Sequence, residues 1–211
     1  PHYPGAERSR DRYLFLPYLV YRGKYIKADD DGVRGELLNK ENYKFDLSFS
    51  AAFPADSLDN DARKGMPDLD WIGEVGPRFL YYAYKNIKAK SKVDISLPIR
   101  AVFSSDFKRV KGHGFVFHPT VTYRRDEFPL KKLDLVLRLG SIFATEETMD
   151  YFYEVKPWFS GGNRGTFDAK AGYLESHLDL AFVYHFQENI IFFSGYQQNI
   201  YEGSKNRGSP L

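Results

Sequence analysis

The chain has 211 residues, enough for one domain with a real core or one closed β-barrel, and its formal net charge is only +2. This near balance gives no electrostatic case for a nucleic-acid partner. Cysteine is absent, which excludes disulfides, thiolate metal sites and thiol nucleophiles. No run of apolar residues approaches the eighteen that a transmembrane helix needs.

The predicted elements are almost all strands, in keeping with an aromatic content of 17%. Residues 13–25 are strand-like but irregular. Residues 43–53 alternate strictly, because the odd positions from Tyr43 to Phe53 are apolar or small and the even ones are mostly polar. Residues 71–84 form a longer, less regular stretch. This part of the chain therefore predicts strands with two unlike faces.

Further predicted strands follow at residues 93–103, 115–123, 133–139, 176–186 and 190–201, separated by turn signals. Convincing helical periodicity is missing, although residues 58–64 are compatible with one turn. The spacing indicates about ten strands of roughly 9–11 residues, which is the length that crosses a bilayer when tilted.

Two all-β architectures share this alternation. A soluble sandwich or lipocalin-like barrel hides the apolar face, whereas an outer-membrane barrel turns it toward lipid and keeps the polar face inside. Long strands of similar length, uniformly large apolar faces and aromatic residues at strand ends favour the membrane barrel.

Several short segments, in order, resemble the MipA/OmpV family (the MltA-interacting protein family) of Gram-negative outer-membrane proteins. No single segment is specific, but the ordered set covers essentially the whole chain. The segments are residues 3–5 (YPG), 16–18 (LPY), 21–23 (YRG), 61 and 63–69 (D, RKGMPDL), 74–77 (EVGP), 150–155 (DYFYEV), 201–204 (YEGS) and 209–211 (SPL). Glu154 stands where the family usually has glycine.

The resemblance implies a single antiparallel transmembrane β-barrel over residues 1–211, located in the outer membrane. Relative to the family, we expect a signal peptide, a first strand and a last strand to be missing here, with 10 or 12 strands in the complete protein. The implied role is scaffolding in peptidoglycan biosynthesis, linking a lytic transglycosylase with a murein synthase. Arg8, Arg10 and Arg12 are candidates to pair with lipopolysaccharide phosphates, although a polar strand start explains them equally well.

The alternation assigns side chains to the two faces of this barrel. The lipid-facing candidates are Phe45, Leu47, Phe49, Leu133, Leu135, Leu137, Leu178, Leu180 and Phe182. The lumen-facing polar candidates are Asp46, Glu74, Arg78, Asp94, Arg100, Asp134, Arg138, His177, Asp179 and His185. Because small barrels fill with side chains, an interior closed by ion pairs is favoured over an open conducting lumen.

The sequence provides no motif for an enzyme, a metal or a cofactor. It contains neither G-x-S-x-G nor a P-loop. His177 and His185 lie about 27 Å apart along one predicted strand, too far to bind the same metal ion. His113 and His118 flank a turn, but no cysteine or nearby carboxylate completes a set of metal ligands with them. We therefore expect a scaffolding protein that is not an enzyme, with a porin-like channel as the first alternative and a soluble lipocalin-like carrier as the second.

Overall fold

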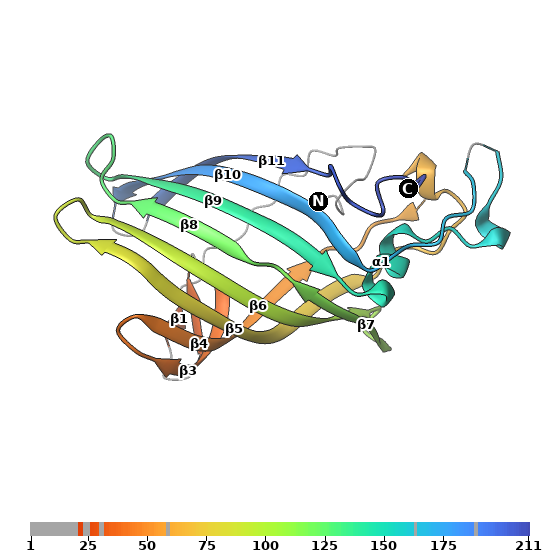
Figure 1. Ribbon diagram of the computed structural model, residues 1–211, viewed down its shortest axis with the longest axis horizontal. Coiled ribbons are helices and arrows are strands. Elements are labelled where there is room, and N and C mark those ends of the chain that lie inside the picture. Colours follow the sequence, from red (N-terminus) through yellow and green to blue (C-terminus); the bar gives the residue numbers. More distant parts are fainter. Residues whose placement is uncertain (1–20, 23–25, 30–31, 58–59, 163, 188–189) are drawn as a thin grey trace.

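The computed structural model describes residues 21–22, 26–29, 32–57, 60–162, 164–187 and 190–211, with side chains described from residue 38 onward. Most of the predicted strand at residues 13–25, and Arg8, Arg10 and Arg12, lie outside these residues. The described chain forms one antiparallel sheet of eleven strands, drawn in Figure 1. The expected all-β antiparallel fold is confirmed.

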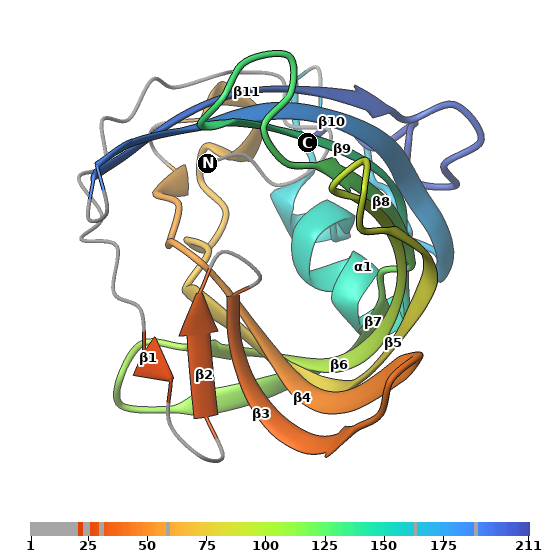
Figure 2. The same cartoon turned by 90° about the vertical axis from the view of Figure 1, so that its left-hand side faces the viewer.

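The strand order follows the chain, since nearly every strand pairs with its neighbours in sequence. The sheet curves strongly, and helix α1 (Glu146–Tyr153) lies within its concave side (Figure 2). The strands are β1 (Tyr21–Arg22), β2 (Ile26–Asp29), β3 (Gly32–Asn39), β4 (Tyr43–Ala52), β5 (Trp71–Asn86), β6 (Ser91–Ser105), β7 (Val110–Phe117), β8 (Thr120–Arg125), β9 (Leu133–Ala144), β10 (Gly172–Gln187) and β11 (Ile190–Ile200).

The predicted strand at residues 115–123 is divided between β7 and β8. The break falls at His118 and Pro119, and proline has no N–H to donate to a ladder. Both halves nevertheless pair with β6 on one side and β9 on the other. The two strands therefore act as one interrupted strand of the wall.

Strands β5, β6 and β10 have 15 or 16 residues, longer than the sequence pattern predicts. Irregular pairing explains part of the difference. In β10 the register shifts between Tyr173 and Glu175, and Leu174 and Glu175 are both buried. Because such a bulge breaks strict alternation, the pattern could be recognised only from residue 176 onward.

Helix α1 was not predicted. Its eight residues, EETMDYFY, begin with two acidic side chains and bury Met149 and Tyr153 one turn apart. Two 3₁₀ turns accompany it in the long connections, η2 (Asp61–Arg63) and η3 (Pro157–Phe159). The first lies within the single turn expected at residues 58–64. Among the described residues, no helix is long and apolar enough to cross a membrane.

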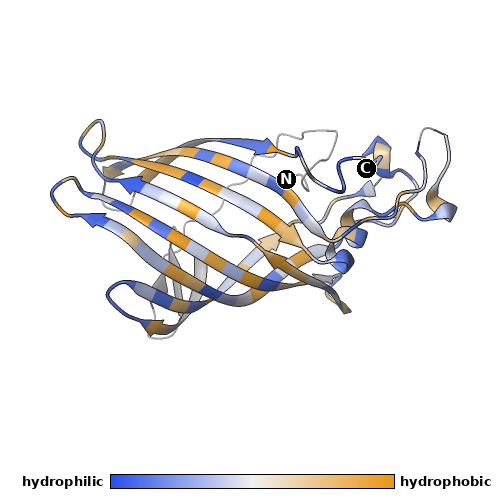
Figure 3. Cartoon of the chain, viewed as in Figure 1, coloured by the Kyte–Doolittle hydropathy of each residue, from blue (hydrophilic) through white to orange (hydrophobic). Residues whose placement is uncertain are grey.

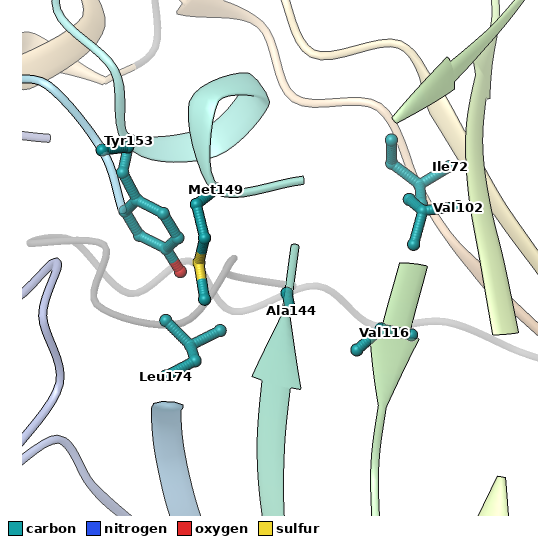
Figure 4. Close-up of a cluster of buried hydrophobic side chains, with 8 residues drawn as sticks. Ile72, Val102, Val116, Ala144, Met149, Tyr153 and Leu174 are labelled. Atoms are coloured by element: carbon teal, nitrogen blue, oxygen red, sulfur yellow. The ribbon is translucent and has the colours of Figure 1, made fainter. Parts of the chain in front are cut away.

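A small apolar core lies where α1 meets the concave side of the sheet. Met149 is fully buried there, in one cluster with side chains of β5, β6, β7, β9 and β10, and it lies near Tyr153 and Leu174 (Figure 4). The buried members of this core are Ile72, Val102, Val116, Ala144, Met149, Tyr153, Ala169 and Leu174.

Away from this core the usual distribution of side chains is inverted. In β4, Lys44, Asp46 and Ser48 are buried, whereas the alternating Phe45 and Phe49 are 39% and 43% exposed. The banding of apolar and polar residues along the strands is visible in Figure 3. The convex face is therefore the apolar one.

Candidate functional site

The charged side chains of the concave face form ion pairs between adjacent strands. Asp46 of β4 lies directly opposite Arg78 of β5. Arg78 Nε and Nη2 donate to Asp46 Oδ1 and Oδ2, each at 2.8 Å, and Lys44 Nζ lies 3.3 Å from Oδ2. Since Asp46 has no exposed surface, its charge is balanced entirely by these groups.

Three more polar pairs link adjacent strands around the wall, and one of them, Arg138 with Asp179, again joins directly opposite residues. Arg100 Nε donates to Glu74 Oε2 at 2.7 Å across β5 and β6. Between β9 and β10, the pair of Arg138 Nη1 and Asp179 Oδ2 measures 3.7 Å, and the pair of His185 Nε2 and Asp134 Oδ2 measures 2.7 Å. The sequence pattern assigned these residues to one face, but their contacts across the strands follow only from the structure.

The two remaining polar candidates have different neighbours. Asp94 Oδ2 lies 4.0 Å from Lys92 Nζ. His177 Nε2 lies 3.3 Å from His118 Nε2, a partner that the sequence did not indicate. A Cβ on Gly140 would lie 2.4 Å from His177 Nε2, so this glycine makes room for the imidazole to cross β9.

His113 has neighbours other than His118. Its Nε2 bonds to Ser104 Oγ at 2.9 Å and its ring packs against Tyr151. Within the described part of the chain, no group of three or more His, Cys, Asp or Glu residues is placed to hold a metal ion. The imidazoles of the wall thus contact polar or aromatic neighbours individually or in a pair.

The convex face carries the apolar candidates. Leu178 of β10 is 47% exposed and lies opposite Leu139 of β9, which is 57% exposed and also faces Val121 of β8. These three side chains form an apolar patch that spans β8, β9 and β10. Of the predicted lipid-facing residues, Phe45, Phe49 and Leu178 are exposed, and the other six are half-buried: Leu47, Leu133, Leu135, Leu137, Leu180 and Phe182.

A cavity of about 200 Å³ lies beside α1. Apolar side chains of the core line most of it, including Val116, Ala144 and Leu174, and the Glu74–Arg100 pair with His118 lies at its polar side. In α1 itself, burial raises the pKa of the Tyr151 phenol. The pKa of the Asp150 carboxyl is also raised, by burial and by the negative charges of Glu154 and Glu146. The sequence did not indicate this cavity, because it did not indicate the helix.

The comparison with models of protein families shows which family this chain belongs to. The model of the MltA-interacting protein MipA matches residues 1–211. The chain belongs to the MipA family. No curated protein and no solved structure matches it.

Three of the segments that carry the resemblance to the MipA family meet at one end of the sheet. Arg63 Nη1 donates to the Phe152 carbonyl at 3.0 Å, and the Asp70 N–H donates to Tyr151 Oη at 2.9 Å. Ser209 Oγ donates to the Tyr153 carbonyl at 2.8 Å. The described residues of three segments (53–57 with 60–70, 145–162 with 164–171, and 201–211) therefore form one cap that includes α1, and these contacts all involve backbone groups.

The opposite end of the sheet is built differently in this MipA family member. There the strands are joined by short turns, at residues 40–42, 87–90 and 126–132, and by the brief connection between β10 and β11. The structure thus has a capped end, with two long connections and α1, and a short-turn end.

Proposed function

We propose that this chain is an outer-membrane β-barrel that acts as a scaffold, formed by residues 1–211 as a single domain and bringing together a lytic transglycosylase of the MltA kind and a murein synthase. Membership of the MipA family, a family of scaffolding proteins rather than enzymes, supports the role. The observation that carries the membrane location is the inverted burial, with Asp46 buried and Phe45 exposed on the same strand.

Two features of the wall support this architecture. The nine apolar candidates on the convex face supply the surface that would contact lipid, and aromatic residues gather near strand ends, among them Tyr43, Tyr84 and Tyr184 at the short-turn end. The ion pairs of the concave face neutralise charges that would otherwise be costly to bury. The barrel thus serves as a rigid, membrane-held base for partner enzymes.

A direct binding experiment tests the scaffold. The purified protein, immobilised in detergent, is expected to retain an MltA-type lytic transglycosylase and a murein synthase when both are added in solution. An unrelated outer-membrane barrel of similar size, immobilised at the same density, is the control. Equal retention by both barrels would contradict the proposed role, because it would reflect non-specific adsorption.

The polar concave face favours one alternative, a porin-like channel for small solutes. Helix α1 and the three ion pairs of the concave face argue against free passage, because they lie on the side of the sheet that a solute would use. We expect planar bilayers containing the protein to show no steady open-channel current. Heat-modifiable migration on gels shows that the protein used is folded. Stepwise conductance by such folded protein would instead favour the channel. Solubility without detergent would favour the soluble carrier.

A further inference from the structure

Two hairpins at the short-turn end carry an excess of positive charge. Residues 85–92 and 124–132, which we call the basic rim, contain eight basic and two acidic side chains, a net charge of +6. Because the whole chain has a net charge of +2, the remaining residues carry −4. The basic side chains are Lys85, Lys88, Lys90, Lys92, Arg124, Arg125, Lys131 and Lys132.

The two hairpins form one connected surface. The Asp126 N–H donates to the Lys90 carbonyl at 2.9 Å, and Lys90 Nζ lies 2.6 Å from Glu127 Oε2. The guanidinium of Arg125 lies over the ring of Phe128, 4.2 Å from its centroid. These contacts join the β5–β6 turn to the β8–β9 turn, so the cations are presented together rather than on independent loops.

The outermost positions of the rim also carry apolar side chains. Ile87 is 81% exposed and Leu130 is 65% exposed, both in turns where glycine, asparagine and aspartate are the usual residues. These two side chains add apolar area among the cations of the rim.

The rim lies beyond the aromatic band of this end. Tyr84, the last exposed aromatic residue of β5, is followed by two more strand residues, about 7 Å of extended chain, before the turn begins. In outer-membrane barrels the short turns face the periplasm and the longer loops face outward. The short-turn end would therefore face the cell wall, with the lysines of the turns clear of the lipid.

We propose that the basic rim binds murein itself, through the free carboxylates of its peptide stems, and thereby holds the barrel against the cell wall. This inference rests on the proposed function for the orientation of the barrel. Lysine and arginine side chains pair with carboxylates, each exposed pair contributing little. A polymer that repeats its carboxylates along each strand engages several such pairs at once, and their combined effect is far larger than one contact.

The test is co-sedimentation of purified, detergent-solubilised protein with isolated murein sacculi. The variant Lys88→Glu/Lys131→Glu changes two exposed rim lysines. The matched control, Lys108→Glu/Lys111→Glu, makes the same charge change in the exposed β6–β7 hairpin at the capped end. Heat-modifiable migration establishes that each variant is folded. We expect the rim variant to bind sacculi about tenfold more weakly than the unmodified protein, and the control to bind as well as it.

Each other outcome overturns the inference. Undiminished binding by the rim variant, equal loss in both variants, or no binding by the unmodified protein would show that the rim is not a murein site. A loss seen on phosphatidylglycerol vesicles but not on sacculi would assign the rim to lipid headgroups. If murein binding fails but the partner enzymes are still retained, the proposed scaffolding function stands without the murein site. If the protein does not insert in membranes, the proposed function fails as well.

Discussion

Arginine in place of Leu139 is expected to destabilise the bilayer-embedded protein by about 2–4 kcal/mol, the cost of a cation on the lipid face near the midplane of a barrel. Leu139 is 57% exposed in the middle of β9, between Val121 and Leu178. The measurement is denaturant unfolding in lipid vesicles, followed by the fluorescence of the two tryptophans.

The control for this change is Leu130→Arg. Leu130 is 65% exposed, close to the value for Leu139, but it lies in the turn between β8 and β9. Its replacement is expected to change the stability by less than about 0.5 kcal/mol, as for most surface substitutions. If both variants were equally stable, the convex face would be in contact with water, and the membrane barrel would be wrong.

Replacing Arg78 with methionine is expected to cost about 3 kcal/mol or more, because it leaves the carboxylate of Asp46 buried with only Lys44 nearby. Asp46 has no exposed surface, and the side chain of Arg78 is 13% exposed. The free energy of unfolding, measured in the same vesicles at neutral pH, checks the expectation.

The double variant Asp46→Leu/Arg78→Met separates the pair from the buried charge. Replacing both members of a buried ion pair with apolar residues is often close to neutral. We therefore expect the double variant to recover most of the stability lost in Arg78→Met. If Arg78→Met had the same free energy of unfolding as the unmodified protein, water would have to reach Asp46. The concave face would then be open at this level.

The alternation of residues was enough to predict most of the wall from β4 onward and the division of its side chains between two faces, whereas β2 and β3 were not predicted. Asp46 and Arg78, 32 positions apart, could be assigned to one face because a strand has a period of two. Their contact could not be predicted, since it depends on the register between β4 and β5, which is fixed by turns of variable length. The same is true of Arg138 and Asp179.

Other features escaped prediction because no period in the sequence marks them. Helix α1 has only two turns, too short for the hydrophobic pattern of a helix to emerge, and its burial comes from packing against strands distant in sequence. The approach of His118 and His177 depends on the absence of a side chain at Gly140. A glycine in a strand signals such a close approach only once the neighbouring strands are known.

The order of the strands in the sheet has a consequence for the way the wall assembles. Because nearly every strand pairs with the strand before it in the chain, most of the hydrogen-bonded ladder can form hairpin by hairpin, with small loop-closure cost. The cap is the exception, since Arg63 and Phe152 are 89 positions apart. Their contact can form only after the intervening strands are in place, so the end bearing α1 is completed late in folding.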